Sequence, residues 1–354
     1  MPLTVLSVSY SLARVSENTA GGAEQVLAIL EEGLARRGHR SLVLAPAGSR
    51  CYGLLIPAQI PTGVLDENAK QEARRTLKRL LSRALARYRV DVVHMHGLDF
   101  SEYLPDCGIP VVVSLHLPLS WYKTEALQSA AGSYRTLVCV SKAQARRATS
   151  GVHIDRVIPN GINLERYNPA RKKGNYALAI GRICPEKGFH LALDAAERAG
   201  VELILAGNVF AYPEHQSYFD CMIRPRLGRN ARFIGAVGGE RKAHLLAGAR
   251  CLLVPSLVPE TSSLVAMEAI ASGTPVIAWR SGALPEIVSD GRIGFLVNSV
   301  EQMADAISCV ESIDPSACRG EAKLRFSSER MIADYLNLYS SILACTKMPE
   351  LEAA

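Results

Sequence analysis

Short apolar runs alternate with helix-like segments along almost all of the 354 residues, and this alternation begins afresh near the middle of the chain. The first apolar run, residues 3–8, precedes a loop and a helical pattern over residues 23–37, which Gly38 ends. Strands alternating with helices of this length form a parallel sheet covered by helices on both faces. Further strands are predicted in this half at residues 41–44, 90–93, 111–115 and 137–140.

A polar stretch with proline and glycine, residues 168–174, separates the two series and reads as a linker. After it we predict strands at residues 176–180, 202–206, 231–234 and 251–254, and helices at residues 189–199 and 241–249. A chain of this length suits two domains of ordinary size. The sequence therefore predicts an α/β protein with two doubly wound parallel sheets, followed by an amphipathic terminal helix that carries Met331 and Tyr335 on its apolar side.

The composition, 48% hydrophobic and 21% charged residues, is typical of a globular protein in water. No apolar run reaches the ~18 residues that a spanning helix needs, and the first residues lack a basic leader, so we expect a cytoplasmic protein. The nine cysteines are scattered without a C-x-x-C pair or other metal-ligand spacing. This favours free thiols in a reducing compartment, and no metal site is predicted.

The segment PETSSLVAMEAIASGTP, from Pro259 to Pro275, carries the most chemistry. It predicts a loop with a carboxylate at Glu260, then a helix with a second carboxylate at Glu268. The start of that helix offers Thr261, Ser262 and Ser263 as caps, with outward backbone N–H groups. Such a terminus attracts phosphate, although polar helix starts also occur throughout α/β proteins without a ligand.

Two further patterns have the chemistry of a phosphate site. Arg182 ends one predicted strand and Lys187 precedes the next helix, so that a planar fork and a point charge stand close together. Gly21 and Gly22 open the first helix and would let backbone amides approach a phosphate closely. Each pattern also has a purely structural explanation. The cations can be an ordinary solvated pair near a turn, and loops before helices often hold glycine.

The segment 259–275 resembles the E-x7-E signature of retaining nucleotide-sugar glycosyltransferases, glycosyltransferase family 4 ("glycosyl transferases group 1"), which have the two-domain GT-B fold. The resemblance continues through GTPVIA, SGALPEIV and DGRIGFLV between residues 273 and 297, and through GGAE at 21–24 and the G-R-x-x-x-E-K-G pattern at 181–188. It covers nearly the whole chain, with residues 50–89 the least similar part.

The resemblance implies an N-terminal acceptor-side domain (1–168), a C-terminal nucleotide-sugar domain (169–326) and a crossover helix (327–354) that packs back on the first domain. It implies catalytic roles for Glu260, His116, Arg182 and Lys187, with the cations stabilising the leaving diphosphate. Glu268 would accept hydrogen bonds from the donor ribose. The remaining donor-binding positions implied are Gly21, Gly22, Gly207, Gly235, Ser262, Ser263 and Leu264. An aromatic-glycine pair common in relatives is Ser262-Ser263 here, which bears on the choice of donor sugar.

His116 follows the apolar run 111–115, at the end of a predicted strand where ligands bind in such sheets. A histidine that only satisfies its own hydrogen bonds is the alternative. His94 and His96 alternate along one strand, and packing is favoured over a metal pair because no third ligand is evident.

Basic residues concentrate in the first half: residues 1–172 hold 22 Lys and Arg against 14 Asp and Glu, a net charge of +8, whereas the remainder holds 18 against 20. Many lie in the Arg74–Arg89 region, where Arg75, Arg79, Arg83 and Arg87 recur every four residues beside a leucine-rich side. A basic amphipathic helix can lie peripherally on the inner face of an anionic membrane. The outer face of an ordinary surface helix has the same pattern. No nucleic-acid motif accompanies the charge.

The resemblance thus predicts a retaining, metal-independent hexosyltransferase or related glycosyltransferase that uses a nucleoside-diphosphate sugar as co-substrate and needs no cofactor. The acceptor is a hydroxyl group, and the mechanism is front-face departure. The alternatives are a nucleotide-sugar epimerase or phosphorylase of the same fold, and a nucleotide-binding relative without turnover.

Overall fold

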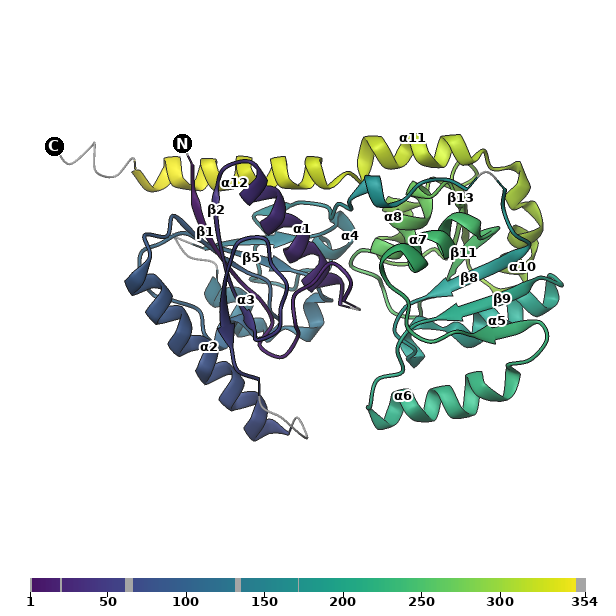
Figure 1. Ribbon diagram of the computed structural model, residues 1–354, viewed down its shortest axis with the longest axis horizontal. Helices are drawn as coiled ribbons and strands as arrows, with labels where there is room; N and C mark the ends of the chain where they lie inside the picture. Colours follow the sequence, from purple (N-terminus) through teal and green to yellow (C-terminus); the bar gives the residue numbers. More distant parts are fainter. Residues whose placement is uncertain (1, 20, 61–65, 131–134, 171, 348–354) are drawn as a thin grey trace. The chain divides into compact units, whose positions relative to one another are not determined.

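The computed structural model describes residues 2–19, 21–60, 66–130, 135–170 and 172–347. The chain divides into a first unit, Met1–Asn160 with Ser328–Ala354, and a second unit, Gly161–Ser327 (Figure 1). Residue 171 of the predicted linker and residues 348–354 of the predicted crossover helix lie outside the described residues.

The first unit contains a seven-stranded parallel sheet in the order β3-β2-β1-β4-β5-β6-β7. Its strands are β1 (Thr4–Val8), β2 (Arg40–Pro46), β3 (Leu54–Ala58), β4 (Val92–Met95), β5 (Val111–Leu115), β6 (Arg135–Cys139) and β7 (Arg156–Val157). Val5 pairs with Ser41 of β2 on one side and with Val92 of β4 on the other. The strand order therefore reverses between β1 and β4, which makes the carboxyl end of that pair the topological switch point.

Continuous burial explains why the apolar runs become central strands. All five residues of β5 and all four of β4 are buried, as expected for strands with helices on both faces. The prediction missed β3 and β7 in this unit. β3 is an edge strand in which only Ala58 is buried, and its apolar run contains Pro57, a residue that central strands exclude.

The helices of the first unit include α1 (Gly22–Arg36), α2 (Glu67–Arg87), α3 (Thr124–Ala130), α4 (Lys142–Ala145) and the C-terminal α12 (Ser328–Lys347). Helix α12 belongs to this unit although it follows the whole second unit in sequence. Its Met331, Tyr335 and Tyr339 are fully buried, and Ile332 fills the space beside Gly33 of α1. The predicted packing of the terminal helix on the first domain is confirmed.

The second unit contains a six-stranded parallel sheet in the order β10-β9-β8-β11-β12-β13. Its strands are β8 (Tyr176–Ile180), β9 (Glu202–Ala206), β10 (Ala231–Phe233), β11 (Cys251–Val254), β12 (Val276–Trp279) and β13 (Gly294–Val297). Its helices are α5 (Phe189–Arg198), α6 (Pro213–Tyr218), α7 (Gly239–Gly248), α8 (Leu264–Ala271), α9 (Leu284–Ile287), α10 (Val300–Cys309) and α11 (Pro315–Arg325). The order reverses between β8 and β11, so two Rossmann-like doubly wound sheets are present, as predicted.

Candidate active site

Arg182, Lys187 and Glu260 lie in the loops that follow β8 and β11, at the topological switch point of the second unit, and Glu268 lies in the next helix. Arg182 stands two residues after β8, and Lys187 ends the short turn η4 (Pro185–Lys187) that follows. Glu260 lies in the loop after β11, and Glu268 lies within α8. Ligands bind at this position in open α/β sheets, so the topology supports the site that the sequence predicts.

Lys187 and Glu260 form an ion pair, with Nζ 2.5 Å from Oε1. The Glu260 side chain is 11% exposed and that of Lys187 is 26% exposed. A lysine ammonium has three N–H donors, of which Glu260 takes one. Arg182 is exposed, and its guanidinium has no hydrogen bond or ion pair within the described parts of the chain. The two cations thus retain donors for an anionic ligand.

The backbone of Glu260 is fixed by a segment whose role the sequence did not reveal. Gly282 has a left-handed conformation, φ +57°, and a Cβ there would collide with the backbone oxygen and nitrogen of Glu260. The next residue, Ala283, donates its N–H to the Glu260 carbonyl at 2.7 Å. Ser256 donates its hydroxyl to the Glu260 carboxylate. The resemblance covered Gly282 within SGALPEIV, but only the structure shows what it supports.

Glu268 is a buried carboxylate with two partners that sequence reasoning missed. Its Oε1 accepts the hydroxyl of Tyr167 at 2.8 Å and the ammonium of Lys242 at 2.6 Å. The other oxygen, Oε2, is buried and has no hydrogen-bond partner. Burial, and then the charge of Glu268, raise the pKa of Tyr167, so this phenol stays protonated and donates. A buried acceptor is therefore left for a ligand hydroxyl.

Helix α8 begins directly after the serine pair, as predicted, but the predicted side-chain cap at Ser263 is absent. Ser263 occupies the N-cap position with extended backbone and makes no capping hydrogen bond. The Ser262 hydroxyl oxygen is buried without a partner. Leu264 is the first helical residue, and the Ser263 side chain does not use the backbone N–H groups of this terminus.

Gly207 and Gly235, the other predicted positions in this unit, are brought together at the ends of neighbouring strands. Gly207 follows β9 and donates its N–H to the Gly235 carbonyl at 2.8 Å. A Cβ on Gly207 would collide with the carbonyl of Gly181, next to Arg182. A side chain is excluded here because two loop backbones touch.

In the first unit, Gly21 is the N-cap of α1, and Gly22 is the first residue of that helix. A glycine N-cap has no side chain that could cap the helix, and a Cβ on Gly21 would collide with the Glu24 carboxylate. His116 follows β5 directly, as predicted, and is 8% exposed. The structure places the two glycines and His116 at the carboxyl edge of the first sheet, the edge where ligands bind in this fold.

His116 belongs to a histidine cluster with His94 and His96. The Nε2 atom of His116 is 3.0 Å from Nδ1 of His96. Burial lowers the pKa of His116 to about 4 and that of the other two well below 6.5, so the cluster is neutral near pH 7. His94 bonds the hydroxyls of Tyr339 at 2.7 Å and Ser114 at 2.8 Å. The packing role favoured for His94 is confirmed, since both of its nitrogens have partners.

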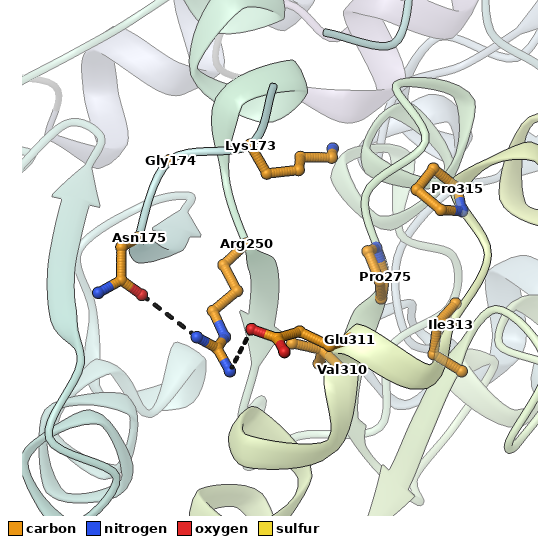
Figure 2. Close-up of a pocket in the computed structure, with 9 residues that line it drawn as sticks. All are labelled: Lys173, Gly174, Asn175, Arg250, Pro275, Val310, Glu311, Ile313 and Pro315. Carbon is orange, nitrogen blue, oxygen red and sulfur yellow. Dashed lines mark hydrogen bonds and ion pairs between the residues drawn. The ribbon is translucent and has the colours of Figure 1, made fainter. Parts of the chain in front are cut away.

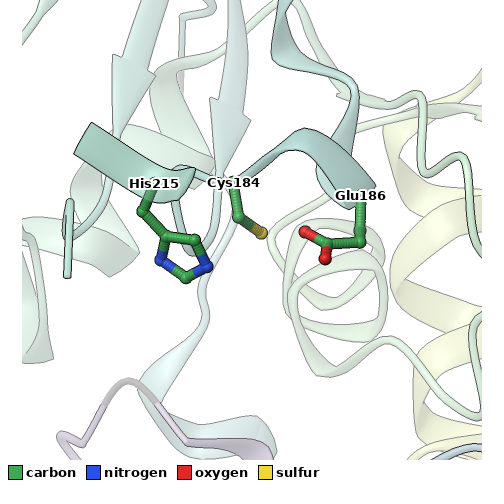
Figure 3. A group of neighbouring side chains, drawn as sticks. All are labelled: Cys184, Glu186 and His215. Atoms are coloured by element: carbon green, nitrogen blue, oxygen red, sulfur yellow. The ribbon is translucent and has the colours of Figure 1, made fainter. Parts of the chain in front are cut away.

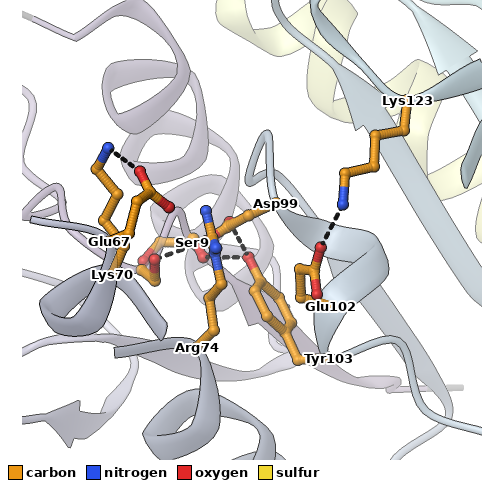
Figure 4. A network of polar contacts seen from close by, with 9 residues as sticks. Ser9, Glu67, Lys70, Arg74, Asp99, Glu102, Tyr103 and Lys123 are labelled. Atoms are coloured by element: carbon orange, nitrogen blue, oxygen red, sulfur yellow. Dashed lines mark hydrogen bonds and ion pairs between the residues drawn. The ribbon is translucent and has the colours of Figure 1, made fainter. Parts of the chain in front are cut away.

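A network around Asp99 joins the loops that follow β1 and β4 (Figure 4). Asp99 accepts the hydroxyl of Ser11 at 2.6 Å and that of Tyr103 at 2.7 Å. Arg74 of α2 approaches the same carboxylate at 3.6 Å, and Tyr103 also donates to the Ser9 carbonyl at 3.3 Å. This network connects the loops after β1 and β4 with α2, and the sequence did not predict it.

A hollow of about 420 Å³ lies at the opposite edge of the second sheet, at the amino ends of β8, β11 and β12 (Figure 2). Its cations are already engaged: Lys173 donates to Thr274 at 2.5 Å, and Arg250 pairs with Glu311 at 3.3 Å. None of the predicted site residues of the second unit lines this hollow, so it is not the candidate site. It is lined by Lys173, Gly174, Asn175, Arg250, Pro275, Val310, Glu311, Ile313 and Pro315.

Comparison with protein families agrees with this geometry. The family model "Glycosyl transferases group 1" matches residues 163–323, and the model "Glycosyltransferase Family 4" matches residues 20–166. The chain belongs to glycosyltransferase family 4. This confirms the resemblance, and the chain is accordingly a glycosyltransferase.

Individual relatives cover most of the chain. A phosphatidyl-myo-inositol mannosyltransferase of Mycobacterium leprae is 25% identical over 365 residues, covering 92% of this chain and 95% of its own. The counterpart in Mycobacterium tuberculosis is 26% identical over 313 residues, covering 80% of each chain. Among solved structures, AviGT4, a glycosyltransferase involved in avilamycin A biosynthesis, is 27% identical with a TM-score of 0.73 and coverage of 97% and 98%. Anabaena HepE in complex with UDP and glucose, 21% identical with a TM-score of 0.76 and coverage of 96% and 100%, shares the GT-B fold.

The described parts of the chain contain no helix both long and apolar enough to cross a membrane.

Proposed function

We propose that this glycosyltransferase transfers a sugar from a nucleoside-diphosphate sugar to an acceptor hydroxyl with retention of configuration. The main support is the arrangement at the switch point of the second unit. There, Lys187 pairs with a partly buried Glu260, Arg182 is exposed nearby in sequence, and the following helix carries a buried Glu268 with one unsatisfied oxygen. A nucleoside diphosphate would present its phosphate oxygens to Arg182 and Lys187 and its ribose hydroxyls to Glu268.

In the proposed reaction, the acceptor oxygen bonds to the anomeric carbon on the face from which the diphosphate departs. The electron pair of the broken carbon–oxygen bond passes to the diphosphate, which takes the proton of the acceptor hydroxyl. Arg182, Lys187 and the N–H groups at Ser262, Ser263 and Leu264 stabilise the charge that develops on the diphosphate. This charge stabilisation comes from the protein, so we expect transfer without a divalent metal.

The other residues are assigned to donor binding. Glu268 Oε2 accepts a ribose hydroxyl, and Glu260 orients the hydroxyls of the donor sugar. Gly207 and Gly235 provide backbone for the base. In the first unit, Gly21 and Gly22 present backbone to donor or acceptor, and His116, held neutral by burial, contacts the sugar.

Kinetics of a lysine variant test the transfer mechanism. Lys187→Ala should lower kcat by about 100-fold or more, because it removes an interaction that strengthens as charge develops. The control is Lys323→Ala, an exposed lysine of α11. Unchanged kcat in Lys187→Ala would refute the assignment. Conversion of the donor sugar into another sugar when no acceptor is present would indicate an epimerase instead.

Calorimetry of nucleotide binding tests the role of Glu268. Glu268→Gln keeps the shape but makes the side chain a weaker acceptor, so we expect at least about tenfold weaker binding of the preferred diphosphate, the loss of one charged hydrogen bond. Glu240→Gln, at an exposed position of α7, should bind normally. Equal affinity of Glu268→Gln and the parent protein would refute the ribose assignment.

We also propose peripheral contact with an anionic membrane at the cytoplasmic face, through the Arg74–Arg89 region. The structure excludes insertion of the helix into the bilayer and leaves only contact at the membrane surface. The apolar side of α2, which includes Leu77 and Leu81, is buried in the first unit and cannot enter a bilayer. The basic side is exposed, so the contact would be electrostatic. The exposed basic residues are Arg75, Lys78, Arg79, Arg83, Arg87 and Arg89.

Vesicle sedimentation tests this contact. Replacing Arg75, Arg79 and Arg83 by glutamine should weaken binding to vesicles with anionic lipid by roughly 100-fold, since each basic residue contributes ~1 kcal/mol near such a surface. Glutamine at Arg229 and Arg241, exposed in the second unit, should have no such effect. Binding that is absent, or equal for neutral and anionic vesicles, would refute the proposal.

A further inference from the structure

The turn that carries Lys187 also gathers three side chains of the types that bind zinc. Cys184 immediately precedes η4, Glu186 lies within it, and His215 comes from α6. The thiol sulfur, a carboxylate oxygen and a ring nitrogen all lie within 4.8 Å of one another. Figure 3 shows the Cys184 sulfur between the imidazole and the carboxylate. Three different ligand types from two separate elements thus face one point.

The hydrogen bonding of this group is incomplete without a further partner. The Cys184 thiol donates to the Arg182 carbonyl, with the sulfur 3.5 Å from the oxygen. However, Glu186 Oε2 and His215 Nδ1 are both buried and have no hydrogen-bond partner. Buried polar atoms nearly always have partners, and two unsatisfied ligand atoms in one cluster are unusual. A bound cation would give Glu186 Oε2 and His215 Nδ1 the partner that they lack.

We propose that Cys184, Glu186 and His215 form a binding site for a borderline-soft divalent cation such as Zn²⁺. Thiolate, imidazole and carboxylate are the ligands that zinc takes in proteins, and three of them leave one position for water. Tetrahedral zinc bonds place ligand atoms roughly 3.3–3.8 Å apart, so the side chains would close by about 1 Å. On binding, a metal–sulfur bond replaces the S–H bond and the proton passes to the buffer.

The site stands beside the candidate diphosphate cations, yet it goes beyond the proposed transfer reaction. Arg182 lies two residues before Cys184, and Lys187 lies three residues after it. A cation held by Cys184, Glu186 and His215 would therefore tie η4, and with it Lys187, to helix α6. No metal site was predicted from the sequence, because His215 belongs to a separate helix and lies far along the chain from Cys184 and Glu186.

Cobalt titration of the full chain, freed of metal with a chelator, tests the site. Co²⁺ bound through a thiolate gives a sulfur-to-metal charge-transfer band, and we expect this band to saturate at one cobalt per chain and to be abolished by Zn²⁺. Cys184→Ser should eliminate the band. His215→Gln should weaken cobalt binding by about 100-fold, as expected for loss of one ligand.

Matched variants separate this site from other thiols and imidazoles. Cys221→Ser and His244→Gln alter exposed residues of the same unit and should leave the titration unchanged. If Cys184→Ser does not fold, as judged by circular dichroism, the result for His215→Gln decides. A parent protein without the band, or a band that persists at full affinity in Cys184→Ser or His215→Gln, would overturn the proposal.

Discussion

Replacing Lys242 by methionine tests whether the buried Glu268 depends on this one cation. Their side chains are 14% and 3% exposed, with Nζ 2.6 Å from Oε1. Methionine keeps most of the apolar stem but removes the charge, which leaves Glu268 only the hydroxyl of Tyr167. Breaking a buried ion pair at one partner typically costs about 3–5 kcal/mol. Because Tyr167 remains, we expect Lys242→Met to lower the unfolding free energy by about 3 kcal/mol, the lower end of that range.

The chain offers a local probe for this measurement. It has two tryptophans, Trp121 in the first unit and Trp279 in β12 of the second. In a Trp121→Phe background, urea unfolding followed by fluorescence reports on the second unit. Lys323→Met, at an exposed position, is the control.

A double-mutant cycle completes the test. Adding Glu268→Gln to Lys242→Met removes the stranded charge, so we expect a coupling of about 2 kcal/mol between the two changes. An unfolding free energy of Lys242→Met within ~0.5 kcal/mol of the parent, the range of ordinary surface changes, would refute the reasoning. So would strictly additive effects of the two substitutions.

Three further predictions concern other parts of the two units. Gly282→Ala places a side chain at positive φ against the Glu260 backbone, so we expect turnover to fall at least about tenfold, measured at saturating donor. Acid should destabilise the first unit: below the ordinary histidine pKa of ~6.5 the unfolded chain binds protons that the buried cluster does not, so stability falls from there toward pH 4. His94→Gln should flatten this dependence in urea titrations at several pH values, and the exposed His244→Gln should not. Tyr339→Phe, which removes a buried hydrogen bond to His94, should cost about 1 kcal/mol in the same assay; no change would contradict the role of this bond.

The sequence predicted the central strands well because burial on both faces leaves a continuous apolar run. β5, β8, β9 and β11 were predicted with their observed bounds. The edge strand β3 was missed although it is apolar, because Pro57 within its run argues against a central strand. Helix α2 was expected from its periodicity, but its sequence could not show that the leucine side packs into the first unit.

The candidate site was predicted as a set of residue types, without their pairings. The spacing of Glu260 and Glu268 and the neighbouring cations marked the segment. The partners that hold it, Lys242 and Tyr167, come from parts of the chain far away in sequence, and nothing in their surroundings distinguishes them. The pairing of Lys187 with Glu260 is likewise a tertiary contact, which periodicity and propensity do not encode.

Metal dependence of nucleotide binding tests the central claim most directly, because the account assigns the diphosphate to Arg182, Lys187 and the start of α8. The measurement is the melting temperature of the full chain with UDP, GDP, ADP or CDP, each with and without magnesium. A ligand that binds the folded state raises the melting temperature by linkage. The account predicts a clear rise with one diphosphate, equal in both conditions. No rise with any of the four, or a rise that requires magnesium, would contradict it.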